Sequence, residues 1–135
     1  MRQDRFTEQA QEALALSQQL VHEYKHSQWD VEHILLALLR LEKGLAGEIL
    51  RKLGADPDEV RSRVEAALDK TPTIAHEGAT FYATPRTVRL LGNASQEADR
   101  LKDEFVGTEH ILVAMTLERE GEAAHILAES GIDQE

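Results

Sequence analysis

One short segment is written twice in this chain. DVEHILLALL at residues 30–39 returns as GTEHILVAM at residues 107–115, 77 positions later (107 − 30 = 77). The same offset, without a gap, aligns Thr7 with Thr84 and Gly54 with Gly131. A repeat that includes residue types typical of helix starts and helix ends indicates that a whole supersecondary unit is duplicated. Two such units are expected to pack with a pseudo-twofold relation.

Both halves have the apolar spacing of amphipathic helices, and no long run alternates with the period of a strand. Thr7, Asp56 and Thr84 are predicted N-caps, and Gly54 and Gly131 stand where a glycine typically ends a helix. The sequence therefore predicts an all-α fold. Its seven helices are expected over about 8–24, 31–41, 45–53, 57–69, 85–101, 107–118 and 122–130.

The domain organisation follows from the repeat. We predict one domain, residues 1–135, built from two tandem four-helix-type repeats. The first repeat covers about 5–69, a linker without helical period covers 70–83, and the second repeat covers about 84–135. The second repeat stops where the first continues into its fourth helix, so the last helix is expected to be truncated or missing.

Composition narrows the function classes. The formal charge of −10 argues against a nucleic acid partner, since phosphate neutralisation drives that binding. The absence of cysteine excludes disulfides and thiolate chemistry. No apolar run approaches the ~18 residues that a membrane helix needs, and the N-terminus lacks the apolar segment of a secretory signal. We therefore expect a cytoplasmic protein that does not contact a membrane.

Catalytic and metal-binding patterns are not found. His33 is not followed by the second histidine of an HExxH site, and a cluster of His22, His26 and His33 has loose ligand spacing. No phosphate-binding loop occurs, and no serine has a nucleophile elbow around it. We expect no metal, no cofactor in this chain and no enzymatic activity.

The helix starts are the candidate binding residues. Backbone N–H groups at Thr7, Thr84 and Thr108 favour an anion, whereas Glu32 and Glu109 could each pair bidentately with a guanidinium. The same residues also stabilise helices without any ligand, as N-caps and as first-turn acids.

An apolar groove for an unfolded peptide or an adaptor protein is a second candidate. Phe6, Phe81 and Tyr82 stand near helix starts and could form it. The alternative is that each of them is a core residue packed before an N-cap.

Three segments resemble the N-terminal repeat domain of Clp-type AAA+ unfoldases. They are RFTEQAQEAL at residues 5–14, the doubled EHIL, and FVGTEHILVAM at residues 105–115. The resemblance covers nearly the whole chain. VGTEHIL is similar to ClpC, and GATFYATPR is also compatible with ClpB. The resemblance implies a domain that binds substrates and adaptors and delivers them to a hexameric ATPase ring, where ATP would be the cofactor of later modules. A stand-alone adaptor or regulator without an ATPase is the alternative.

ClpC-type domains receive phosphorylated arginine at corresponding positions. The resemblance therefore implies two pockets, one formed by Glu32 with Thr7 and one by Glu109 with Thr84. The first repeat departs from this pattern, because it has Asp30-Val31 where the second has Gly107-Thr108. An aspartate there would repel a phosphate, so the second pocket is the better candidate.

Overall fold

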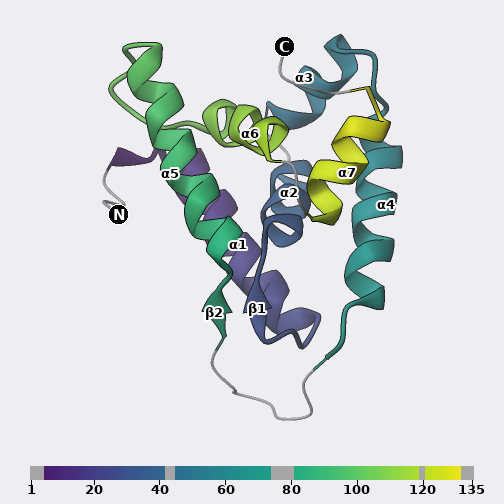
Figure 1. Ribbon diagram of the computed structural model, residues 1–135. Helices are drawn as coiled ribbons and strands as arrows, with labels where there is room; N and C mark the ends of the chain where they lie inside the picture. Colours follow the sequence, from purple (N-terminus) through teal and green to yellow (C-terminus); the bar gives the residue numbers. More distant parts are fainter. Residues whose placement is uncertain (1–4, 42–44, 74–80, 119–120, 132–135) are drawn as a thin grey trace.

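The computed structural model describes residues 5–41, 45–73, 81–118 and 121–131. It confirms the all-α fold, with only two two-residue strands among the described residues (Figure 1). In chain order the elements are α1 (Glu8–Glu23), β1 (Gln28–Trp29), α2 (Val31–Arg40), α3 (Ala46–Lys52), α4 (Pro57–Lys70), β2 (Tyr82–Ala83), α5 (Pro85–Arg100), α6 (Thr108–Leu117) and α7 (Glu122–Glu129).

The predicted helix ends agree with the structure to within a residue or two. The Thr7 hydroxyl accepts the backbone N–H of Ala10 at 3.1 Å, and the Asp56 carboxylate accepts that of Asp58 at 3.0 Å. Gly54 follows α3 with φ +92° and Gly131 follows α7 with φ +85°, a region that other residues rarely adopt. These caps are local interactions, which is why the sequence predicted them.

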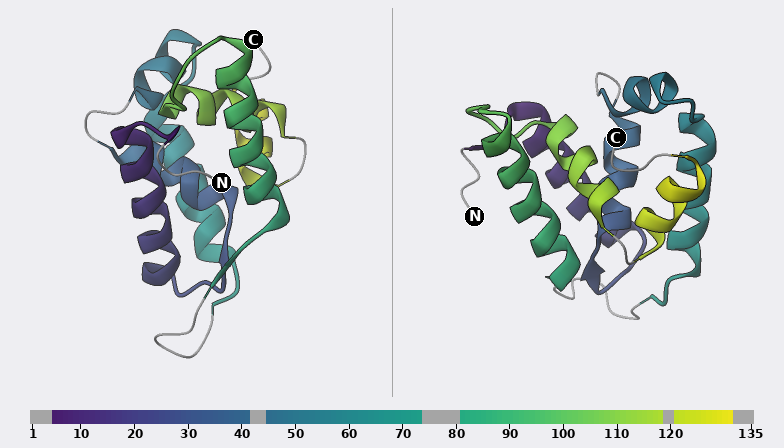
Figure 2. Two further views of the ribbon diagram at one scale, coloured as in Figure 1. Left: turned by 90° about the vertical axis from the view of Figure 1, so that its left-hand side faces the viewer. Right: turned by 45° about the horizontal axis from the view of Figure 1, so that its top comes forward.

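Helix α2 lies at the centre of the molecule. All residues from Val31 to Leu38 are buried, and α2 packs against α1 on one side and α4 on the other (Figure 2). In the second repeat, α6 packs most extensively against α5 and also contacts α7. The equivalent of α4 would begin at residue 134 (57 + 77), outside the described residues. The expectation of a truncated last helix thus stays a prediction.

Short backbone pairings connect the two repeats. β1 pairs in parallel with β2, with Trp29 opposite Ala83, and an isolated bridge joins Phe6 to Val106. The two pairings correspond under the offset of 77, since 29 + 77 = 106 and 6 + 77 = 83. Each repeat therefore brings the segment before its first helix against the other repeat. The pseudo-twofold relation of the two repeats stays a prediction.

The buried face of α5 matches the spacing of its apolar residues only in part. That spacing predicts a stripe of Val88, Leu91, Ala94, Ala98 and Leu101. Leu91, Ala94 and Ala98 are buried, but Val88 and Leu101 are 57% and 52% exposed. Thr87 and Leu90 are fully buried instead. The Thr87 hydroxyl donates to the backbone oxygen of Trp29 at 3.0 Å, which turns this face of α5 toward the first repeat. A contact between the repeats decides the orientation of the helix.

Candidate functional site

The candidate residues gather at two corners, each made by both repeats. The first corner consists of Asp30, Val31 and Glu32 at the start of α2, with Thr84 and Arg86 at the start of α5. The second corner consists of Gly107, Thr108 and Glu109 at the start of α6, with Phe6 and Thr7 before α1.

Backbone hydrogen bonds show which helix starts meet at each corner. The N–H of Thr84 donates to Trp29 O at 3.1 Å, and the N–H of Thr7 donates to Val106 O at 2.9 Å. Thr84 thus belongs with the helix of Glu32, and Thr7 with the helix of Glu109. The expected pockets paired these residues within a repeat. In the structure each pair joins residues of different repeats, because the segment before the first helix of each repeat is hydrogen-bonded to the other repeat.

The histidine of each EHIL has a structural role. His33 Nδ1 accepts the N–H of Asp30 at 3.0 Å, and His110 Nδ1 accepts the N–H of Gly107 at 2.8 Å. Each ring lies in the first turn of its helix and satisfies a backbone donor that the helix leaves open. Both histidines are buried. The repeated histidine is therefore a helix cap.

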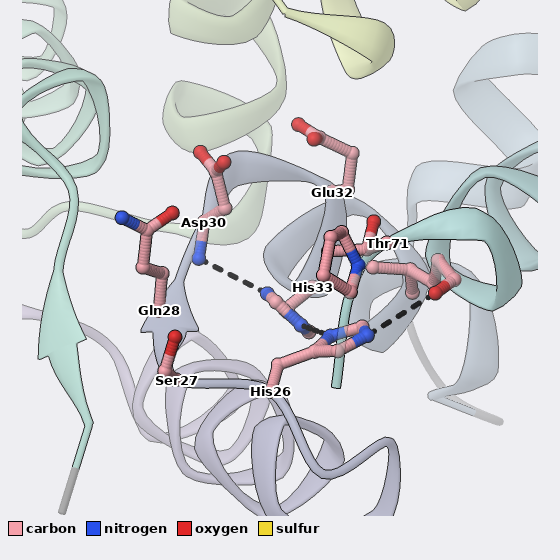
Figure 3. A pocket seen from close by; sticks show the side chains of 9 residues that line it. His26, Ser27, Gln28, Asp30, Glu32, His33 and Thr71 are labelled. Carbon is pink, nitrogen blue, oxygen red and sulfur yellow. Dashed lines mark hydrogen bonds between the residues drawn. The ribbon is translucent and has the colours of Figure 1, made fainter. Parts of the chain in front are cut away.

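Behind the first corner, His33 begins a buried hydrogen-bonded chain (Figure 3). Because His33 Nδ1 accepts, its proton lies on Nε2, which donates to His26 Nδ1 at 2.8 Å. His26 Nε2 then donates to the backbone oxygen of Leu68 near the end of α4, at 3.1 Å. Burial, together with the neighbouring His26, lowers the pKa of His33 to about 4. Burial also lowers the pKa of His26, so the chain is neutral near pH 7.

The three histidines considered as metal ligands, His22, His26 and His33, take part in other interactions. The ring nitrogens of His26 and His33 are engaged in the hydrogen-bonded chain, and the ring of His22 packs on Phe81 with centroids 5.1 Å apart. Among the described residues, no group of three or more ligands is placed to hold a metal ion.

A guanidinium of the protein itself lies in the first corner. Arg86 Nε donates to Asp30 Oδ1 at 2.7 Å, and Arg86 Nη2 donates to Asp30 Oδ2 at 2.5 Å. Burial acts to raise the pKa of Asp30, but hydrogen bonds from Arg86, the Val31 backbone and Thr84 outweigh it and lower that pKa. Arg86 is not among the site residues predicted from the sequence. A signal was present, since Asp30 and Arg86 align with the uncharged residues Gly107 and Gln9.

Glu32 is the buried acid of the first corner. Its side chain is 10% exposed, Oε1 lies 3.5 Å from Arg86 Nη2, and Oε2 has no hydrogen-bond partner among the described residues. Burial, with the nearby Asp30 charge, raises the pKa of Glu32 to about 7 although Arg86 opposes the shift. A pocket of about 240 Å³ borders this residue and the His26–His33 pair (Figure 3).

The second corner is more open. The Glu109 side chain is 48% exposed, and its Oε1 lies 3.7 Å from His110 Nδ1. Of the described residues, no lysine or arginine forms an ion pair with Glu109. The Glu109 carboxylate packs against the backbone of Gly107. It can do so because glycine has no side chain, and a Cβ at this position would lie 1.8 Å from Oε1. A guanidinium could reach this carboxylate from solvent.

The three aromatic candidates do not form one exposed groove. Phe6 is only 4% exposed and belongs to the core, which corrects its assignment to a groove. Tyr82 is 60% exposed and its hydroxyl accepts from Gln28 Nε2 at 2.9 Å, while Phe81 packs on His22. Phe6 is buried because its backbone bridges Val106 in the other repeat.

Residues 5–130 match the Clp repeat (R) N-terminal domain family. The negative regulator of genetic competence ClpC/MecB of Bacillus subtilis is 36% identical over 128 residues, and the chaperone protein ClpB of Oceanobacillus iheyensis is 38% identical over 130 residues. Each match covers 95% of this chain but only 15% and 16% of the relative, so the chain spans a small part of those proteins.

Solved structures show the same fold. The Hsp104 N-terminal domain of Candida albicans superposes with a TM-score of 0.81, at 20% identity, over 96% of this chain and 83% of that one. A ClpV N-domain in complex with a VipB peptide superposes with a TM-score of 0.73, at 22% identity, over 97% and 81%. Within the part of the chain that the structure describes, no helix is both long and apolar enough to cross a membrane.

Proposed function

The chain belongs to the Clp repeat (R) N-terminal domain family, and we propose that it binds protein substrates and adaptors for a Clp-type ATP-dependent unfoldase or disaggregase. In this proposal the chain carries no catalysis and needs no cofactor. ATP would be used by ATPase modules elsewhere in the protein, which acts in the cytoplasm. The observation that carries the proposal is the family match over residues 5–130. A solved relative of the same fold, ClpV, holds a peptide on its N-domain.

The proposed contact is a side chain that is cationic at its inner end and anionic at its tip, as in phosphoarginine. Glu109 supports it, because its carboxylate is half exposed and has no arginine or lysine partner among the described residues. A carboxylate can receive a guanidinium through two parallel hydrogen bonds. The open N–H groups at the start of α6 favour a negative charge nearby. Thr7, from the other repeat, belongs to the same corner.

Binding at one domain would be weak, and the ring would strengthen it. Several copies of the domain on one hexamer raise the effective concentration of a tethered substrate, so that a modest affinity suffices for capture. A substrate that is bound weakly to each domain can then leave it quickly and enter the ATPase ring. The formal charge of −10 fits protein partners and does not fit nucleic acid.

Titration of the domain with free phosphoarginine, followed by NMR chemical shifts, tests this contact. We expect saturable shifts at the start of α6, and a loss of affinity of about tenfold or more in Glu109→Gln, since charge-assisted hydrogen bonds contribute ~1.5–3 kcal/mol. Glu59→Gln is the matched control, because Glu59 is an exposed first-turn acid of α4. Absence of shifts at millimolar ligand, or unchanged affinity in Glu109→Gln, would refute the contact.

The wider proposal is tested by the coding sequence after Glu135. It should encode an ATPase module with a phosphate-binding loop, and deletion of residues 1–135 should slow the ATP-dependent unfolding of substrates. If no ATPase module is encoded, the domain does not serve an unfoldase in the same chain.

A further inference from the structure

The two corners differ at matched positions. Under the offset of 77, Asp30 corresponds to Gly107 and Arg86 corresponds to Gln9. The first corner thus has one carboxylate and one guanidinium that the second corner lacks. These two extra charges come from different repeats, 56 residues apart, yet they contact each other directly. Changes that are paired in space point to a shared role.

Arg86 fills the first corner in the way that a guanidinium ligand would. Its Nε and Nη2 form two near-parallel hydrogen bonds to the Asp30 carboxylate, at 2.7 and 2.5 Å, which is the bidentate geometry of arginine recognition. Nη2 also lies 3.5 Å from Glu32 Oε1. On the far side, a Cβ at Gly121 would lie 2.7 Å from Nη1, so the guanidinium is held against the start of α7.

We propose that Arg86 is a permanent internal occupant of the first corner, locked there by Asp30, and that this domain therefore binds a single guanidinium ligand, at Glu109. This inference rests on the proposed function and adds a stoichiometry to it. Asp30 and Arg86 are specificity-determining residues, because they remove one of two sites that the repeat would otherwise supply.

Burial makes this occupant hard to displace. Asp30 and Glu32 side chains are only 13% and 10% exposed, and the Arg86 side chain is 28% exposed. A free ligand would have to expel a guanidinium tethered within the same fold, whose effective concentration is on the order of millimolar or more. It would also leave Asp30 as an anion next to any incoming phosphate. Both effects favour the internal arginine.

Exchange of the paired residues between the corners tests the proposal. Asp30→Gly, Val31→Thr and Arg86→Gln together give the first corner the residues of the second and should open it. Gln9→Arg with Gly107→Asp should close the second corner. The backbone of Gly107 has φ −99° and ψ 178°, which an aspartate adopts freely. The three atoms nearest to the new Cβ all belong to the end of the Glu109 side chain, with Oε1 at 1.8 Å, so this flexible carboxylate must shift to make room.

Calorimetric titration with phosphoarginine, at fixed salt, measures the number of sites. We expect one site in the wild-type domain, two in the opened variant and none in the closed variant. Adding Glu109→Gln to the opened variant should leave one site, at the first corner. Circular dichroism confirms that each variant is folded, and the closed variant gives an independent answer if the opened one is not.

Other numbers of binding sites would overturn either the block by Arg86 or the contact at Glu109. Two sites in the wild type, or one site that survives Glu109→Gln, overturns the proposal that Arg86 blocks the first corner. A wild type without any site refutes the proposed phosphoarginine contact at Glu109. In that case the opened variant still decides the inference, since one gained site supports it and no gained site overturns it.

Discussion

Glu32 should make the domain less stable as the pH rises, and Glu32→Gln should remove this effect. The folded protein raises the pKa of Glu32 from 4.5 to about 7, mainly by burial. A raised pKa means that the folded state holds its proton more tightly than the unfolded state does. The contribution to stability is therefore fully present below pH 4.5 and is lost as the pH rises through about 7.

The size of the effect follows from the shift. A difference of 7 − 4.5 = 2.5 units at 1.36 kcal/mol per unit corresponds to about 3 kcal/mol at pH 8. At pH 5 the same two pKa values give a loss of stability of only about 1 kcal/mol from the ionisation of Glu32. Glutamine resembles the protonated acid in shape and does not ionise. Glu32→Gln should therefore be more stable than the wild type at pH 8, and the gain should shrink toward pH 5.

Urea unfolding followed by the fluorescence of Trp29 measures this difference. Trp29 is the single tryptophan, and its indole N–H donates to the buried Ser17 hydroxyl at 2.8 Å, so its emission reports on tertiary structure. Titrations at pH 5, 6, 7 and 8 give the free energy of unfolding of each protein. Glu59→Gln, at an exposed position, is the control and should show no such trend.

A loss of stability in Glu32→Gln at pH 8 would refute the reasoning. It would mean that Glu32 is ionised and that its attraction to Arg86, 3.5 Å away, outweighs the cost of burial. The first corner would then be a two-acid clamp on one arginine. A gain that is the same at every pH would point to packing rather than to ionisation.

Two further predictions use the repeat and the buried chain. In the Glu32→Gln background, the free energy of unfolding should rise by about 3 kcal/mol between pH 4 and pH 6.5. The reason is that the folded state lowers the pKa of His33 from 6.5 to about 4, so the stability that neutral His33 contributes is lost as the pH falls. A free energy of unfolding, measured with urea, that stays constant over this range would contradict a neutral His26–His33 pair. Leu36→Ala should cost about 2–5 kcal/mol, whereas Val113→Ala, at the equivalent position (36 + 77), should cost less than about 1 kcal/mol, because Leu36 is fully buried and Val113 is 41% exposed. Thermal unfolding of the two variants checks this, and equal losses would show that the second repeat covers Val113.

Much of the fold could be predicted because its signals are local. Caps such as Thr7 and Asp56 bind backbone groups two or three residues away, and Gly54 ends its helix through its own dihedral angles. These interactions depend on neighbours in the chain, so they can be recognised from spacing alone. The repeat strengthened the prediction, since the same pattern occurs at both copies.

The prediction was weaker where a helix meets the other repeat. Val88 fits an apolar stripe of α5, yet it faces solvent, while Thr87 is buried against Trp29. The alignment contained a hint, because Thr87 corresponds to the buried Ala10 (87 − 77 = 10). A small residue at one copy and an alcohol at the other can share a tight interface that hydrophobicity alone does not reveal.

The sequence by itself determined the all-α architecture and the helix ends. Only the tertiary structure decided that Thr84 meets the helix of Glu32 and that Arg86 fills the first corner. The offset of 77 shows which residues are equivalent, but it does not show which copy each one contacts. Pairing within a repeat and pairing across repeats satisfy the same local rules. The choice between these two pairings depends on how the helices of the two repeats pack together. The same packing buries Glu32 and so sets its charge state.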